Sequence, residues 1–337
     1  MVTIYDISKK TGFSPPTVSK ALNGAGTLSL VTRGRILDAA RDMGYVPNLT
    51  ARALSTRRSR LIGIINKDIY LTDVFIPPIF NNILGGARQV MEAQGYELLM
   101  LRGAHDFLTA ASYRNIDGFL LFAIPGEEEY RSLLKSRLPC VSTNDLLPGI
   151  STAITDNYGG AVTAVQYLVD LGHRHIAYIA GPVTWMSPAS EERFQGYRDC
   201  LKRNGITENP ELTETAGLWS ALGGYEAARR LLEKKETFTA IFATSDNLAY
   251  GTIKALNEAG IRVPQDVSIV GFDGDPLGEY VSPPLTTMRQ DSVLIGKTAA
   301  ELLLKRLSGE ERAELKRIPA ELVLRSSCRP TKGDFLC

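Results

Sequence analysis

The sequence predicts two domains of different class, a small all-α domain at residues 1–46 and a much larger α/β domain at residues 61–330. Its length of 337 residues exceeds what one ordinary domain holds. The charge divides near the same boundary, because residues 1–60 carry ten Lys and Arg against three Asp, a net of +7. From Leu61 onward, short apolar runs alternate with amphipathic stretches, which is typical of parallel β-strands joined by helices.

Residues 4–22 predict two short helices joined by a tight turn. The first helix ends at Gly12, which can take the positive φ of a sharp turn, and Ser14 is a good N-cap for the second helix. The spacing of the residues along these two helices and the turn fits a helix-turn-helix, whose second helix enters the major groove of DNA. The alternative is an ordinary αα-hairpin, which the basic charge disfavours. The residues that carry this spacing are Ile7, Ser8, Thr11, Gly12, Phe13, Val18 and Ala21.

A third helix at residues 31–43 would complete a small core. Its inward positions are expected to be Val31, Ile36, Ala39, Ala40 and Met43. Residues 47–60 follow as a hinge and linker, in which Thr50 to Leu54 could form barely one and a half helical turns. A helix this short is marginal in water, so we expect it to order only against a partner or DNA.

The larger domain has the pattern of repeated βαβ units. Strands are expected at residues 61–66, 96–101, 118–122, 140–143, 176–180, 239–243 and 267–271. Helices are expected at residues 79–93, 158–171, 189–204, 221–234, 247–259 and 291–307. A ligand would bind in the cleft at the carboxyl ends of the strands.

Both domains contain motifs that resemble the LacI/GalR family of repressors. In the first sixty residues they are TIYDI at 3–7, GFSPPTVSKALNG at 12–24, GYVPN at 44–48 and ARAL at 51–54. In the larger domain they are DNYGG at 156–160, LGHRHI at 171–176, RFQGY at 193–197, SD at 245–246, GFD at 271–273 and PLTTMRQ at 284–290. The resemblance extends over nearly the whole chain.

The resemblance implies a helix-turn-helix DNA-binding domain followed by an α/β domain of the type I periplasmic-binding-protein-like fold. That fold has two doubly wound subdomains crossed by three strands. The N-subdomain would comprise about residues 61–154 with 290–318, and the C-subdomain about residues 155–289 with 319–330.

The resemblance also implies a homodimer, or a tetramer, that binds a palindromic double-stranded DNA operator. Leu54 of the hinge helix would wedge into the minor groove and kink the duplex, although a small dimer contact is its alternative role. Many relatives carry Arg at the position of Lys20, and Lys acts more as a point charge, so direct base readout is expected to be thin. The implied DNA-binding residues are Thr3, Tyr5, Ser14, Pro16, Thr17, Ser19, Lys20, Asn23, Ala51 and Leu54.

The chemistry of a sugar suggests which residues hold a small-molecule effector in the cleft. Hydroxyl groups suit carboxylate and guanidinium groups, and the apolar face of a sugar ring suits an aromatic side chain. The candidates are Phe80, Arg193, Trp219, Ser245, Asp246, Asp273 and Gln290, of which Ser245 and Gln290 rest on the resemblance. The alternatives are a surface ion pair for Arg193, an N-cap for Asp273 and core packing for Trp219.

We therefore expect a repressor of carbohydrate-metabolism genes, controlled by a sugar or sugar derivative. A nucleobase or nucleoside corepressor is the alternative effector, and a solute-binding protein and an enzyme are the competing classes. The sequence has no GxSxG, no Walker loop and no GxGxxG after a strand, so neither catalysis nor a cofactor is expected. His173 and His175 suit a turn or cap better than a metal site.

The same sequence predicts a cytoplasmic protein with no membrane partner. Its first residues lack the basic and apolar regions of a secretory signal, and no apolar run approaches about 20 residues. The four cysteines are widely scattered, which is typical of reduced thiols in the cytosol.

Overall fold

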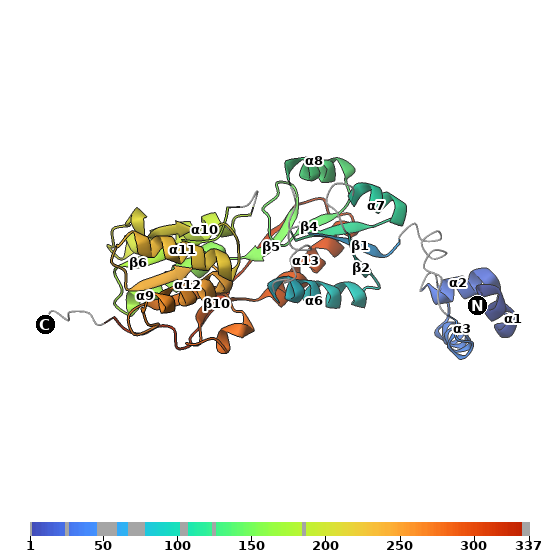
Figure 1. Ribbon diagram of the computed structural model, residues 1–337. Helices are drawn as coiled ribbons and strands as arrows, with labels where there is room; N and C mark the ends of the chain where they lie inside the picture. Colours follow the sequence, from blue (N-terminus) through green and yellow to red (C-terminus); the bar gives the residue numbers. More distant parts are fainter. Residues whose placement is uncertain are drawn as a thin grey trace. The chain divides into compact units, whose positions relative to one another are not determined.

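The computed structural model describes residues 2–23, 27–45, 59–66, 78–101, 107–122, 126–183 and 187–331 (Figure 1). The chain divides into two compact units, Met1–Arg60 and Leu61–Cys337. The predicted hinge helix, with Ala51 and Leu54, lies outside the described residues. Within the described ranges, no helix is both long enough and apolar enough to cross a bilayer.

The first unit consists of three short helices, α1 (Ile4–Thr11), α2 (Pro15–Leu22) and α3 (Leu30–Asp42). Thr3 and Asp6 cap α1 reciprocally, and Gly12 ends this helix with a φ of 78°. The side chain of Ser14 accepts a hydrogen bond from the backbone N–H of Thr17 at the start of α2. The buried core contains Ile7, Val18, Ala21, Ile36 and Ala40. The three predicted helices are confirmed to within two residues at each end.

One expectation for this core is wrong. Val31 is 73% exposed, whereas Ile36 and Ala40 are buried. Ile36 and Ala40 are four residues apart and share a helix face, while Val31 precedes Ile36 by five residues and is rotated away. Ala39 is only half-buried.

The second unit contains two six-stranded sheets, and we call each sheet with its helices a lobe. The first lobe has the strand order β11-β5-β4-β3-β1-β2, with every pair parallel. Its strands are β1 (Leu61–Ile65), β2 (Glu97–Met100), β3 (Gly118–Leu121), β4 (Cys140–Ser142), β5 (Ser151–Thr155) and β11 (Leu315–Ile318). Helices α6 (Pro78–Ala93) and α13 (Ser292–Leu307) pack together on one face, and α7 (Phe107–Arg114) and α8 (Glu127–Ser136) cover the other (Figure 1).

The second lobe has the order β12-β10-β9-β8-β6-β7, in which only β12 runs antiparallel to its neighbour. Its strands are β6 (Ile176–Ala180), β7 (Thr213–Thr215), β8 (Ala240–Ala243), β9 (Ser268–Asp273), β10 (Thr286–Gln290) and β12 (Ala320–Val323). Helices α9 (Asn157–Asp170) and α10 (Ala189–Arg203) cover one face, and α11 (Ala221–Glu233) and α12 (Asp246–Glu258) the other. The prediction of two doubly wound α/β subdomains is confirmed.

The chain passes between the lobes three times, after β5, after β10 and between β11 and β12. Beside these crossings, Arg317 of β11 donates two hydrogen bonds to the carboxylate of Glu192 on α10, at 2.8 and 2.6 Å. This ion pair joins the two lobes outside the backbone connections.

Seven strands and six helices of this unit lie where the sequence predicts them, but other elements were missed. These are β5, β7, β10, β11 and β12, with helices α7 and α8. The missed strands are rich in Thr or are partly exposed, such as STAIT for β5 and LKRI for β11. They therefore lack the continuous apolar run by which buried parallel strands are recognised.

Candidate ligand-binding site

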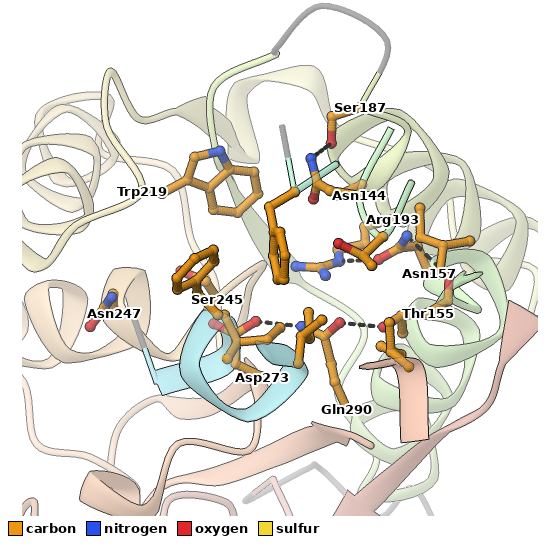
Figure 2. A pocket seen from close by; sticks show the side chains of 18 of the residues that line it. Asn144, Thr155, Asn157, Ser187, Arg193, Trp219, Ser245, Asn247, Asp273 and Gln290 are labelled. Atoms are coloured by element: carbon orange, nitrogen blue, oxygen red, sulfur yellow. Dashed lines mark hydrogen bonds between the residues drawn. The ribbon is translucent and has the colours of Figure 1, made fainter. Parts of the chain in front are cut away.

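A cavity of about 170 Å³ lies between the two lobes of the second unit (Figure 2). It is smaller than the roughly 300–1,000 Å³ of pockets for drug-sized ligands, so it suits a molecule of one or two rings. From the first lobe it is lined by Asn66, Ile79, Phe80, Ile83, Phe122, Thr143, Asn144, Ile154, Thr155 and Ile295. From the second lobe it is lined by Asn157, Ser187, Ala189, Arg193, Trp219, Ser245, Asn247, Asp273 and Gln290.

The first lobe supplies most of the apolar wall. Ile79, Phe80 and Ile83 project from consecutive turns of α6, where positions three and four apart share a face. The Phe80 ring meets Phe122 edge-on, with ring centroids 4.4 Å apart. This contact holds Phe80 in place, so its exposed edge is a fixed surface for a ligand.

Trp219 forms part of the wall on the second lobe. Its ring packs directly over Gly181, at a distance that leaves no room for a Cβ on that residue. The ring is only partly buried and also contacts the core that lies under α11 and α12. Trp219 therefore packs against the core, which was its alternative role, and also lines the cavity.

Arg193 is deeply buried at the base of the cavity and is held from three directions. Its Nε donates to Asn157 Oδ1 at 2.9 Å, and its Nη1 donates to the carbonyl oxygen of Thr244. The guanidinium carbon lies 3.7 Å from the centre of the Phe272 ring. Among the described residues its Nη2 has no hydrogen-bond partner, so it is available to a ligand. Burial lowers the pKa of Arg193, which the negative charge of Asp273 partly opposes.

Asp273 is the last residue of β9 and has a φ of 138°, a backbone conformation that residues other than glycine rarely adopt. Gln290 Nε2 donates to its Oδ1 at 2.7 Å, and Gln290 Oε1 accepts from the hydroxyl of Thr155. Burial raises the pKa of Asp273, while the nearby charge of Arg193 lowers it. A charged acceptor and a charged donor are thus fixed side by side in one wall (Figure 2).

Asp246 does not line the cavity but supports Asp273 from behind. Its Oδ2 accepts from the backbone N–H of Asp275 at 2.6 Å, and its Oδ1 accepts from the hydroxyl of Thr287 at 2.5 Å. Its own backbone N–H points to Asp273 Oδ2 at 3.4 Å. Burial and the charge of Asp273 raise the pKa of Asp246. Its two acceptors are already occupied, so Asp246 fits a positioning role better than ligand contact.

Ser245 lines the cavity while serving as the N-cap of α12, because its hydroxyl accepts from the backbone N–H of Leu248 at 3.2 Å. Six of the seven predicted effector residues therefore line this one cavity. The exception is Asp246.

The sequence interpretation missed several polar lining residues, chiefly amides and hydroxyls. Asn144 donates to Ser187 Oγ at 3.3 Å, which joins the first lobe to the second across the cavity (Figure 2). Asn66 and Asn144 both follow the carboxyl ends of first-lobe strands, which is the signal that could have found them. The other missed residues are Thr143, Thr155, Asn157, Ser187 and Asn247.

In the first unit, the described residues predicted to bind DNA lie on α1 and α2, at their N-caps and at the C-cap of α2. Tyr5 is 74% exposed, and Pro16 and Lys20 are exposed on one face of α2. Asn23, the C-cap of α2, donates a hydrogen bond from Nδ2 to the Oγ of Ser19, four residues earlier, at 3.3 Å. The hydroxyls of Ser14 and Thr17 hydrogen-bond each other at 2.8 Å, and Thr3 caps α1.

Comparisons with known proteins agree with both units. Residues 3–48 match the lacI family of bacterial regulatory proteins, and residues 165–328 match the periplasmic binding protein-like domain. The HTH-type transcriptional repressor CytR of Escherichia coli (strain K12) is 34% identical over 341 residues, which cover 97% of this chain and 96% of CytR. The HTH-type transcriptional regulator CelR of Thermobifida fusca is 31% identical over 318 residues, covering 91% and 92% of the two chains.

Solved structures align with nearly the whole chain. The lac repressor dimer bound to operator and the anti-inducer ONPF aligns with a TM-score of 0.80 and 27% identity, covering 97% of this chain and 99% of that one. The complex of CelR with cellobiose aligns with a TM-score of 0.73 and 28% identity, covering 97% and 100%. The chain therefore belongs to the LacI family of bacterial regulatory proteins, and it is a DNA-binding transcriptional regulator rather than an enzyme.

Proposed function

We propose that this repressor binds a palindromic operator as a homodimer and that its effector is a sugar or sugar derivative held in the cavity between the lobes. One observation supports a sugar as the effector. Asp273 and Gln290 lie beside Arg193 in one wall, and an apolar wall that includes Phe80 and Trp219 completes the cavity. A polyhydroxylated ring matches this arrangement, since it combines hydroxyl groups with an apolar face.

A charged acceptor next to a charged donor suits neighbouring hydroxyl groups, because each hydroxyl can donate to one and accept from the other. The solved relatives agree, since CelR is complexed with cellobiose and a LacI family regulator from Enterococcus faecium holds ribose. A nucleoside also carries a ribose ring and is the competing effector. A free nucleobase would leave the acceptor Asp273 with fewer donors to bind.

The position of the polar residues connects the cavity to the crossings between the lobes. Thr155 and Gln290, which hydrogen-bond each other, end the strands β5 and β10 just before two of the three crossings. A ligand that contacts Gln290 therefore binds next to the segments about which the lobes would move. Such a ligand controls operator binding to the extent that its affinity differs between two arrangements of the lobes.

The DNA-binding part of the proposal assigns base contacts to Pro16, Thr17 and Lys20. Thr3, Tyr5, Ser14, Ser19 and Asn23 would contact the phosphate backbone, and Ala51 and Leu54 the minor groove. The exposure of Pro16 and Lys20 on one face of α2 supports this assignment. Operator affinity should then fall steeply as the salt concentration rises.

The test is calorimetry on the full-length chain with monosaccharides, disaccharides, nucleosides and nucleobases, followed by operator binding in the presence of each ligand that binds. We expect a sugar to bind and to change operator affinity. Asp273→Asn should weaken that sugar at least about tenfold, since it removes a buried charged acceptor, and should leave operator affinity without ligand unchanged. Glu128→Gln, an exposed charge change on α8, is the matched control. Binding of nucleosides but not sugars would contradict the proposed effector class.

A further inference from the structure

Asn66 lines the cavity and has a side-chain donor without a partner. The residue directly follows β1 and is only 5% exposed. Its side-chain nitrogen Nδ2 is buried and has no hydrogen-bond partner among the described residues. Because Asn66 also lines the cavity, a molecule in the cavity is the available source of an acceptor.

Three other amides around the cavity have hydrogen bonds within the protein. Gln290 Nε2 donates to Asp273, Asn157 Nδ2 donates to the carbonyl of Thr155, and Asn144 Nδ2 donates to Asp145 and Ser187. Among the described lining residues, Asn66 alone has a fully buried side-chain nitrogen or oxygen without a partner. A buried unpaired amide destabilises the free protein, and that penalty is removed when a ligand supplies an acceptor.

We propose that Asn66 is a specificity-determining residue whose Nδ2 donates to an acceptor oxygen of the effector. This inference rests on the proposed function in so far as that oxygen belongs to a sugar, as a hydroxyl, ring or glycosidic oxygen. Asn66 belongs to the first lobe, whereas Arg193 and Asp273 belong to the second. An effector that satisfies all three therefore spans the cavity and joins the lobes through hydrogen bonds. A ligand without the acceptor would lack this hydrogen bond to the first lobe.

The matched pair of variants is Asn66→Leu and Asn81→Leu. Leucine has the same branched skeleton as asparagine, with bulkier methyl ends, and removes the unpaired donor, whereas Asn81 is an exposed residue of α6 that does not line the cavity. Asn66→Leu should not lower the Tm of the free full-length protein, because a buried amide without a partner is replaced by an apolar group. It should weaken effector binding by about tenfold or more, as expected when a buried donor loses its ligand partner. Asn81→Leu should change neither quantity.

Analogues of the effector identify the oxygen. In calorimetry with a series of deoxy and carbocyclic analogues, one analogue should bind the wild type and Asn66→Leu with equal affinity, because it lacks the oxygen that Asn66 contacts. Equal affinity of both proteins for the unmodified effector would overturn the inference, as would a clear fall in the free-protein Tm of Asn66→Leu. These outcomes are separable from the effector class: if a nucleoside binds instead of a sugar, the same comparison is made with that nucleoside, and the Tm comparison needs no ligand.

Discussion

Replacing Gly181 by alanine should push the ring of Trp219 out of its place in the cavity wall. Gly181 is buried directly after β6, and a Cβ built on it would lie within 3.0 Å of three carbons of the Trp219 ring. Carbon atoms in ordinary contact are about 3.5–4.0 Å apart, so the ring must withdraw by on the order of 1 Å. Gly181 has an ordinary φ, and steric overlap is therefore the main effect of the substitution.

The expected cost follows from two opposing effects. Overpacking a tight contact destabilises by about 1–3 kcal/mol, whereas replacing glycine by alanine stabilises by about 0.4–1 kcal/mol through the unfolded chain. The unfolding free energy should therefore fall by roughly 1–2 kcal/mol, which lowers the Tm by several degrees for a domain of this size. Effector affinity should fall as well, because a ring displaced by about 1 Å no longer forms the same surface for the ligand.

The measurements are thermal denaturation and calorimetric titration of the effector on the full-length chain. Gly217→Ala is the matched control, because a Cβ on this glycine, two residues before Trp219, meets nothing within 4 Å. The control should bind the effector as the wild type does. If Gly181→Ala is destabilised but binds the effector with unchanged affinity, Trp219 does not contact the effector. If Gly181→Ala is as stable as the wild type, Trp219 does not pack tightly on Gly181.

Three further predictions concern stability and the coupling of the lobes. As the pH drops through about 6.5, the wild type should lose more unfolding free energy than His173→Gln, because burial lowers the pKa of His173 and the unfolded chain then binds a proton that the folded protein excludes. Gly296→Ala should lower the Tm, since a Cβ here on α13 would overlap the Ile83 carbonyl oxygen of α6, and such overpacking costs about 1–3 kcal/mol. Glu192→Gln should change the effector Kd about two- to fivefold at low salt, because it breaks the ion pair with Arg317 that joins the lobes, and pairs of this kind contribute up to about 1 kcal/mol.

Each of these predictions has a control. His173→Gln should flatten the stability profile between about pH 7.5 and 5.5, and a profile as steep as that of the wild type would assign the effect to another group. Gly85→Ala has open space for its Cβ and should keep its Tm, so an equal loss at Gly85 and Gly296 would contradict the steric argument. Glu191→Gln removes an exposed neighbouring charge, and it should leave the Kd unchanged. The effect of Glu192→Gln should shrink at high salt, because salt screens exposed ion pairs.

Local sequence was sufficient for elements whose signal is periodic or rests on one special residue. Gly12, with its positive φ, and Ser14, with its capping bond, mark the turn between α1 and α2 as the sequence predicts. The continuous apolar strands of both sheets were also recognisable. The strands β5 and β10 were not, because their Thr-rich sequences lack a continuous apolar run, although both strands lie in the interior of their sheets. Those two strands carry Thr155 and Gln290, so the missed elements belong to the candidate site.

The sequence by itself determined the class of both units and six of the residues that line the cavity, because βαβ units place strand ends at one edge of a sheet. Only the tertiary structure decided what each of these residues faces. Asp246 and Asp273 follow neighbouring strands, yet Asp246 is engaged by Asp275 and Thr287 while Asp273 lines the cavity. Asn66 has no local sequence feature that reveals its unpaired nitrogen. Burial and hydrogen-bond satisfaction depend on groups that are distant in the sequence, and for this reason they become defined only when the two lobes fold together.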